Sequence, residues 1–194
     1  STFQELTLKN NHPNVKLLNC GLSDENGELN FYIPKDNELA MNGSFRMKSN
    51  RELDNYNITK IKVLKLDDII EENLPKNSTF GLWVDVEGLS DKVLSGCRNF
   101  LVNDSIECQL IKIEVESQLI WKGQSSDLNL IELLKSFNYV PIFRDFEYQE
   151  QYNIIFIKIS LYERVRIIIN NYENQLNSLE LSKDEQDKSI REKL

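Results

Sequence analysis

The chain has 194 residues and a formal net charge of −8, with 40% hydrophobic and 28% charged residues. This length and composition are typical of one soluble domain with a full core. Lysine and arginine are scattered along the chain rather than clustered, which disfavours nucleic acid as a partner. No apolar run approaches the roughly 18 residues that span a membrane, and no signal peptide opens the chain. We therefore expect a cytoplasmic protein without a membrane partner, unless a preceding segment carries a targeting signal.

The few cysteines and the single histidine exclude several kinds of site. Cys20, Cys97 and Cys108 lie at long spacings without a Cys-x-x-Cys pair, so neither a disulfide framework nor a zinc site is indicated. The only histidine, His12, precedes Pro13 in an expected exposed turn. This disfavours a catalytic histidine and any metal site built on histidine. We expect buried, reduced thiols.

Hydrophobic periodicity and turn residues predict alternating strands and helices. In chain order, we expect a helix to about residue 10, strands over 15–20 and 29–33, a polar segment over 35–57, a strand over 58–66, a helix over 67–73, a strand over 80–86, a helix over 91–101, a strand over 106–115, a helix over 127–137, and strands over 139–143 and 154–159. Strands separated by helices indicate an α/β fold with a mostly parallel sheet. The polar link between the last two strands predicts an antiparallel hairpin.

The strand predicted over 80–86 leads into carboxylates. Its apolar run is typical of a strand covered on both faces, and sheets of that kind bind ligands beyond the carboxyl ends of their strands. Asp85 and Glu87 stand at that end and are candidate functional residues. The alternative is that they only stabilise the N-terminus of the following helix. We expect Trp83 and Trp121 to pack in the interior, although Trp121 could also line a substrate rim.

Several motifs, taken together and in order, resemble the FkbM-type methyltransferases. The run Asp85-Val86-Glu87-Gly88 resembles the end of a family strand, and the helix after it closes with the family's Val-Leu-x-Gly pattern at 93–96. The resemblance also includes residues 14–34 with a Leu-Ser-Asp turn, the loop Asn42-Gly43-Ser44, the segment 60–70 and the strand over 108–117. It covers about residues 1–160.

The resemblance implies a Rossmann-like fold of the class I methyltransferase type. It also implies transfer of a methyl group from S-adenosylmethionine to a hydroxyl of a sugar or secondary metabolite. In this family the position of Asp85 borders methyl donor and acceptor, so Asp85 is the candidate for acceptor positioning or general base, with Glu87 and Glu114 as supporting groups. The implied cofactor-binding residues are Leu22, Ser23, Asp24 and Asp85. Ser23 and Asp24 would border the adenine, and Asp24 also opens an ordinary turn.

The absence of a glycine-rich loop departs from the family pattern. Such a loop lets backbone approach the cofactor closely, but no two of the seven glycines lie within two residues of each other. The opening residues resemble the family's helix after its second strand, so we expect the leading β-α-β unit to be absent. We therefore expect this chain alone to bind S-adenosylmethionine weakly or not at all. It is either part of a larger methyltransferase or a non-catalytic binding or assembly module.

Two further carboxylates, Glu114 and Glu116, close the strand over 106–115. Alternation with period two puts each acidic pair on one face of its strand, so four carboxylates could converge. Converging carboxylates recruit a cation or hold protons more tightly. A metal-dependent hydrolase is therefore an alternative function. The other interpretation is that Glu87 and Glu116 point to solvent.

The segment from residue 161 onward lies outside the resemblance. We expect two parts, a partial methyltransferase-like domain over 1–160 and a helical segment over 161–194. Apolar residues recur in this segment at spacings of three and four: Tyr162, Val165, Ile169, Tyr172, Leu176 and Leu179. Such spacing is typical of a coiled-coil seam or of a helix face packed on a core. We expect a homodimer through this helix, with the domain's own sheet or another domain as the alternative partner.

Overall fold

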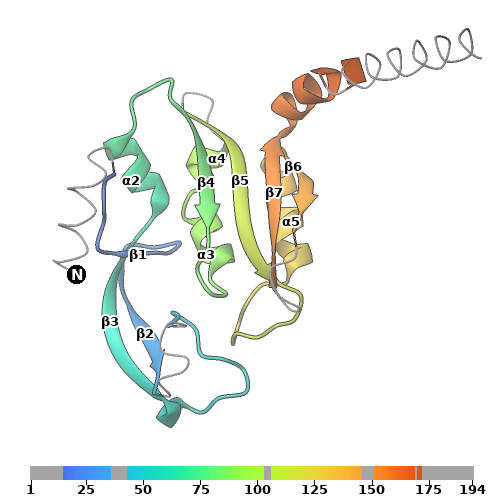
Figure 1. Cartoon of the computed structure of the whole chain (residues 1–194). Coiled ribbons are helices and arrows are strands. Elements are labelled where there is room, and N and C mark those ends of the chain that lie inside the picture. Colours follow the sequence, from blue (N-terminus) through green and yellow to red (C-terminus); the bar gives the residue numbers. More distant parts are fainter. Residues whose placement is uncertain (1–14, 36–42, 103–105, 146–150, 169, 172–194) are drawn as a thin grey trace, which may run out of the picture.

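The computed structural model describes residues 15–35, 43–102, 106–145, 151–168 and 170–171, so the predicted N-terminal helix and His12 lie outside the described residues. Strands and short helices follow one another along the chain (Figure 1). The elements are β1 (Gly21–Leu22), β2 (Gly27–Pro34), the 3-10 helix η2 (Leu53–Asn55), β3 (Tyr56–Leu64), α2 (Leu66–Asn73), β4 (Thr79–Val84), α3 (Ser90–Ser95), α4 (Arg98–Val102), β5 (Glu107–Glu116), α5 (Asp127–Ser136), β6 (Tyr139–Arg144) and β7 (Gln151–Lys158).

The larger sheet has the strand order β4-β5-β7-β6. β4 and β5 run parallel, with Trp83 opposite Lys112 and Val84 opposite Ile113. β7 is antiparallel to β5 and to β6, which confirms the predicted hairpin. Because β4 and β5 are parallel neighbours, their carboxyl ends lie at the same edge of the sheet. The residues that follow Val84 therefore lie beside the last residues of β5.

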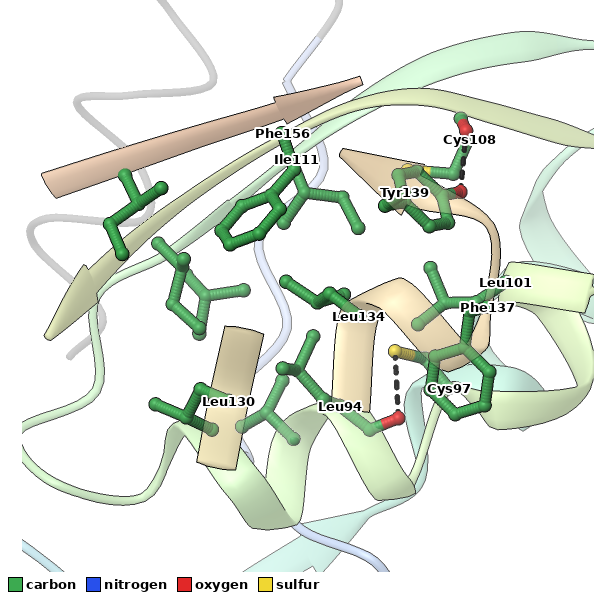
Figure 2. Packing of buried hydrophobic residues seen from close by; sticks show 14 of the residues in the cluster. Leu94, Cys97, Leu101, Cys108, Ile111, Leu130, Leu134, Phe137, Tyr139 and Phe156 are labelled. Carbon is green, nitrogen blue, oxygen red and sulfur yellow. Dashed lines mark hydrogen bonds between the residues drawn. The ribbon is translucent and has the colours of Figure 1, made fainter. Parts of the chain in front are cut away.

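Helices α3, α4 and α5 lie on one face of this sheet (Figure 1). Their apolar side chains interdigitate with those of β5 and β7, and Leu94, Leu134 and Phe156 are fully buried there (Figure 2). The Tyr139 hydroxyl donates a 2.6 Å hydrogen bond to the Cys108 carbonyl oxygen inside this core. Each fully buried large apolar side chain contributes about 1.5–3 kcal/mol. This packing holds the helices, and the turns that precede them, in fixed positions against the sheet.

The smaller sheet has the order β1-β3-β2, with β1 parallel and β2 antiparallel to β3. The loop after β1 touches the end of α3. A Cβ atom added to Gly96 would lie 2.0 Å from the carbonyl oxygen of Ser23, closer than any side chain permits. A glycine at this position therefore allows the contact that brings Ser23 and Asp24 beside α3.

The helix predicted over 91–101 is interrupted and forms two helices, α3 and α4. Asp67 of α2 explains the interruption. Its backbone N–H donates to the Gly96 carbonyl oxygen at 2.9 Å, and its carboxylate accepts hydrogen bonds from the backbone N–H groups of Asn99 and Phe100 at 3.2 and 3.0 Å. The free N–H groups at the start of α4 are thus capped by a side chain from another element. Local periodicity carries no sign of such a cap.

Three other expectations are wrong. In the region of the strand predicted over 15–20, only Gly21–Leu22 forms a strand, and Val15 and Leu18 are 42% and 45% exposed. The sheets are mixed rather than mostly parallel. Trp83 is 68% exposed, because in the described part of the chain helices cover one face of the larger sheet. The other described elements are confirmed, with ends that differ by up to three residues.

A helix follows β7 directly, and residues 159–168 and 170–171 are helical. Tyr162 and Val165, two of the seam positions, are half-buried. The remaining seam positions, Ile169, Tyr172, Leu176 and Leu179, lie outside the described side chains. Within the described ranges, no helix combines the length and the apolar character needed to cross a bilayer.

Candidate functional site

Carboxylates gather where β4 and β5 end. Glu114 and Glu116 share one face of β5 because side chains alternate along a strand, and Glu87 lies in the turn that follows β4. One carboxylate oxygen from each of these residues lies within 4.8 Å of the other two. Asp85 is exposed and lies outside this group. Three of the four converging carboxylates expected from the sequence thus come together, and we call Glu87, Glu114 and Glu116 the carboxylate cluster.

The turn that carries Glu87 has an unusual backbone. Glu87 has a φ of 45° and Gly88 a φ of 80°, both in the left-handed region. A Cβ atom added to Gly88 would lie 2.2 Å from Cδ1 of Trp121, so the indole ring packs directly on the glycine backbone. Left-handed backbone is costly for residues other than glycine and persists where the surroundings hold it. The turn is therefore held in place by its contacts.

Glu116 is the most buried member of the carboxylate cluster, at 4% exposed. Its carboxylate accepts hydrogen bonds from Nε1 of Trp121, at 3.0 Å, and from Nε2 of Gln124. Burial raises the pKa of Glu116, the Trp121 hydrogen bond opposes this, and the nearby charge of Glu87 raises it further. The interpretation that Glu116 points to solvent is wrong. Trp121 is itself 3% exposed and packs in the interior as expected.

Glu87 is half-buried, so a ligand can still reach its carboxylate, and its pKa is raised. Burial raises the pKa of Glu87, and the charge of Asp85 raises it further, while Lys48 lowers it. A carboxylate with a raised pKa is a better proton acceptor at neutral pH than an ordinary one. The spacing of the cluster also suits a single hard cation. The arrangement can thus either take a proton or hold a cation.

A second group of contacts joins three loops around the cluster. The Arg46 guanidinium pairs with the Asp91 carboxylate through two 3.0 Å hydrogen bonds, and the Ser125 hydroxyl donates to the same carboxylate at 3.2 Å. Backbone hydrogen bonds join Ser49 to Ile120 and Lys122 to Met47. The segment before η2, the start of α3 and the loop after β5 are therefore joined at the lower end of the sheet in Figure 1.

A pocket of about 350 Å³ opens beside this region, between the loop after β1, the strand β2 and helix α3. Its volume falls in the range of small-molecule sites, which is roughly 300–1,000 Å³. The lining combines aromatic, apolar and charged side chains: Ser23, Asp24, Glu25, Leu29, Asn30, Tyr32, Phe45, Arg46, Leu89 and Lys92. Such a mixed lining suits a ligand with one planar apolar part and a few polar groups.

Asp24 and Lys92 form an ion pair on the wall of this pocket, with 2.7 Å between Nζ and Oδ2. Partial burial raises the pKa of Asp24, but hydrogen bonds from Lys92 and Ser23 outweigh this effect and lower the pKa below its ordinary value. The hydrogen bond to Asp24 raises the pKa of Lys92. The pair therefore stays charged and fixes the loop after β1 against α3.

The predicted cofactor residues divide into two groups. Ser23 and Asp24 line the pocket. Leu22 packs against the hydrophobic core, and Asp85 lies at the end of β4 without lining the pocket. Sequence reasoning misses Arg46, because no local pattern distinguishes an arginine that pairs with a distant carboxylate from any other surface arginine.

Any metal site in the described part of the chain would have carboxylate ligands. Among the described histidine, cysteine, aspartate and glutamate side chains, the only group close enough to share an ion is the carboxylate cluster. Cys97 and Cys108 are buried and Cys20 is half-buried, and all three are free thiols. Burial raises the pKa of Cys108 to about 11, so this thiol stays protonated and unreactive at neutral pH.

Comparison with known families agrees with the motifs. The family model of the FkbM methyltransferase domain matches residues 2–141, which include β4, β5 and the carboxylate cluster. No curated protein and no solved structure gives a significant match. Because the family match extends over well more than half of its length, the chain belongs to the FkbM methyltransferase domain family.

Proposed function

We propose that the chain carries the acceptor side of an S-adenosylmethionine-dependent O-methyltransferase that acts on a hydroxyl of a sugar or secondary metabolite. Membership of the FkbM family supports methyl transfer. The observation that carries the rest is the position of Glu87, a half-buried carboxylate with a raised pKa at the end of β4. Ligands of α/β folds bind at such strand ends. This position makes Glu87 a stronger candidate for the base than the exposed Asp85.

We also propose that the larger sheet is the second half of a Rossmann-like sheet of the class I methyltransferase type. The order β4-β5-β7-β6, with β7 antiparallel between β5 and β6, supports this proposal. The parallel neighbours β4 and β5 bring their carboxyl ends together, as that fold requires of its site. We also propose a division into a domain over 1–160 and a tail over 161–194, because β7, the last strand of the larger sheet, ends at Lys158.

The pocket beside α3 fits one end of the cofactor. Ser23 and Asp24 would hold its polar groups, and the aromatic side chains of Tyr32 and Phe45 offer surfaces for a planar ring. When bound, S-adenosylmethionine supplies the methyl group. The chain has no glycine-rich loop among its seven glycines, so the backbone contacts that such a loop provides are not available from it. We therefore propose weak binding by this chain alone.

The side chains at the strand ends would act on the acceptor. Asp85, exposed at the end of β4, would orient an acceptor hydroxyl through a hydrogen bond. Glu87 would take the proton of that hydroxyl as it becomes a nucleophile, which contributes roughly 10²–10⁴-fold to rate. Glu114, whose carboxylate accepts a 3.4 Å hydrogen bond from Gln151, would support the orientation of Glu87 from within the carboxylate cluster. Activity should then rise with pH through the raised pKa of Glu87.

The experiment follows transfer of a labelled methyl group from S-adenosylmethionine to a panel of hydroxylated sugars and metabolites, in a protein that joins this chain to a leading β-α-β unit with a glycine-rich loop. Glu87→Gln should lower kcat by about 10²–10⁴-fold, because an amide cannot accept the proton. Asp85→Asn should raise KM more than it lowers kcat. Glu132→Gln on α5, where the carboxylate is 71% exposed, is the matched control and should leave turnover unchanged. Absence of transfer to every hydroxyl acceptor, or a Glu87→Gln effect within twofold, would contradict the proposal.

The hydrolase alternative keeps one supporting observation, the spacing of the carboxylate cluster. Against it, both oxygens of Glu116 already accept hydrogen bonds from Trp121 and Gln124, which leaves fewer free ligand atoms. NMR spectra recorded during titration with Mn²⁺ distinguish the two proposed functions. Strong paramagnetic broadening of the Glu87 and Glu114 signals at micromolar Mn²⁺ would favour a cation site, whereas the methyltransferase proposal predicts no specific broadening there.

A further inference from the structure

The position of Glu87 depends on a backbone conformation that its own side chain disfavours. With a φ of 45°, Glu87 is one of three non-glycine residues with positive φ among the described residues. Unlike asparagine, glutamate has no short polar side chain that stabilises this conformation locally. Such a residue stays left-handed only when neighbouring groups hold it. The group that holds this backbone conformation therefore also positions the Glu87 carboxylate.

Ser44 makes a contact that holds the backbone of Glu87 in this conformation. Its hydroxyl donates a 2.7 Å hydrogen bond to the Glu87 carbonyl oxygen and accepts a 3.0 Å hydrogen bond from the Arg46 backbone N–H. The serine is 2% exposed, so water does not compete for either bond. Its own backbone is fixed on β2, because Ser44 and Tyr32 exchange hydrogen bonds of 3.1 and 2.8 Å.

The segment that carries Ser44 is locked from its other side. The Arg46 side chain is 10% exposed, pairs with both oxygens of Asp91 and also donates to the Gly123 carbonyl oxygen. Asp91 belongs to α3, directly after the Glu87 turn. Two contacts therefore hold this turn: Ser44 binds the Glu87 carbonyl oxygen, and Arg46 binds Asp91 at the start of the following helix.

We infer that Ser44 is a positioning residue of the carboxylate cluster: its hydroxyl holds the Glu87 carbonyl, fixes the left-handed turn and so directs the Glu87 side chain towards Glu114 and Glu116. The inference deepens the proposed function and rests on it for its catalytic meaning. The structural claim stands on the hydrogen bonds alone. Without the Ser44 hydroxyl, the turn loses the bond to its carbonyl, and Glu87 can return to an ordinary backbone conformation.

The test compares the full chain with Ser44→Ala by NMR spectroscopy. Backbone shifts and the intraresidue HN–Hα distance report the φ of Glu87, and the ¹³C carboxyl shift reports the surroundings of its side chain. Ser44→Ala should remove the left-handed signature and move the carboxyl signal towards that of the exposed Glu132. Ser49→Ala is the matched control, because the Ser49 hydroxyl lies in the same segment and donates to the Leu119 carbonyl oxygen at 3.4 Å. It should leave the Glu87 signals unchanged.

Conservative variants keep the test decisive. Ser44→Thr retains the hydroxyl and should preserve both Glu87 signatures. If Ser44→Ala does not fold, Ser44→Cys keeps a similar volume with a much weaker donor and should show the same changes in reduced size. Unchanged Glu87 signals in folded Ser44→Ala and Ser44→Cys, or equal changes in Ser49→Ala, would overturn the inference. Neither cofactor nor acceptor is present, so this outcome is separate from failure of the methyl-transfer assay.

Discussion

Glu116 shows how a single buried carboxyl makes stability depend on pH. Burial raises the pKa of its folded state above the ordinary value of 4.5, so the folded chain binds this proton more tightly than the unfolded chain. The stability that the protonated group contributes is therefore complete below about pH 4.5 and is lost as the pH rises through the folded pKa. The hydrogen bond from Trp121 limits the loss without removing it.

The corresponding variant is Glu116→Gln, which keeps the shape and removes the titration. Its free energy of unfolding, relative to the original chain, should increase as the pH rises from 4 to 7, because only the original chain loses the contribution of the proton. Urea unfolding at several pH values measures this difference. Glu132→Gln on the exposed side of α5 should show no such trend. A pH-independent difference for Glu116→Gln would mean that Glu116 titrates normally.

The site could be predicted from the sequence only in part, for reasons that lie in single residues. The alternation on β5 and the end of β4 placed Glu87, Glu114 and Glu116 on adjoining positions, and these three converge. Periodicity carries no information on how a turn points, so the exposed Asp85 and the buried Glu116 could not be told apart. The contacts of Ser44 and Arg46 join positions more than 40 residues apart and leave no local pattern.

At the scale of elements, the contact between α3 and the loop after β1 connects the pocket to the core. Gly96→Ala would place a methyl group 2.0 Å from the Ser23 carbonyl oxygen, so one backbone must move. Overpacking of this kind costs about 1–3 kcal/mol or more. We expect a lower unfolding midpoint and shifted amide signals of Ser23 and Asp24. Gly81→Ala is the matched control, since its added Cβ meets nothing closer than 3.7 Å. Equal stability of the two variants would contradict this role of Gly96.

Element order was predicted well, and the failures have physical causes. The antiparallel hairpin and most strand positions followed from alternation and from polar links. The break between α3 and α4 arises from Asp67, which caps α4 from a distant element. The exposure of Trp83 arises from the arrangement of the helices, which an apolar run such as 80–84 cannot reveal.

At the scale of the whole molecule, the tail helix is the expected site of self-association. The seam over 162–179 is predicted from its spacing, and its described members Tyr162 and Val165 are half-buried. Charges at two seam positions, Ile169→Glu with Leu176→Glu, should convert a dimer to folded monomers because burying them in an apolar seam is unfavourable. Ile167→Glu is the control, since Ile167 lies off the seam and is 58% exposed. Sedimentation velocity measures both. A monomeric original chain at high concentration would show that the dimer prediction is wrong.

The central claim is that this chain presents one end of an S-adenosylmethionine site beside the carboxylate cluster. Amide shift mapping during titration of the ¹⁵N-labelled chain with S-adenosylmethionine tests it most directly. The account predicts shifts at Ser23, Asp24, Leu89 and Lys92, with a dissociation constant weaker than about 10 μM, or roughly −7 kcal/mol. Shifts confined to another surface, or none at several millimolar cofactor, would contradict the proposed site, and binding tighter than this limit would contradict its weakness.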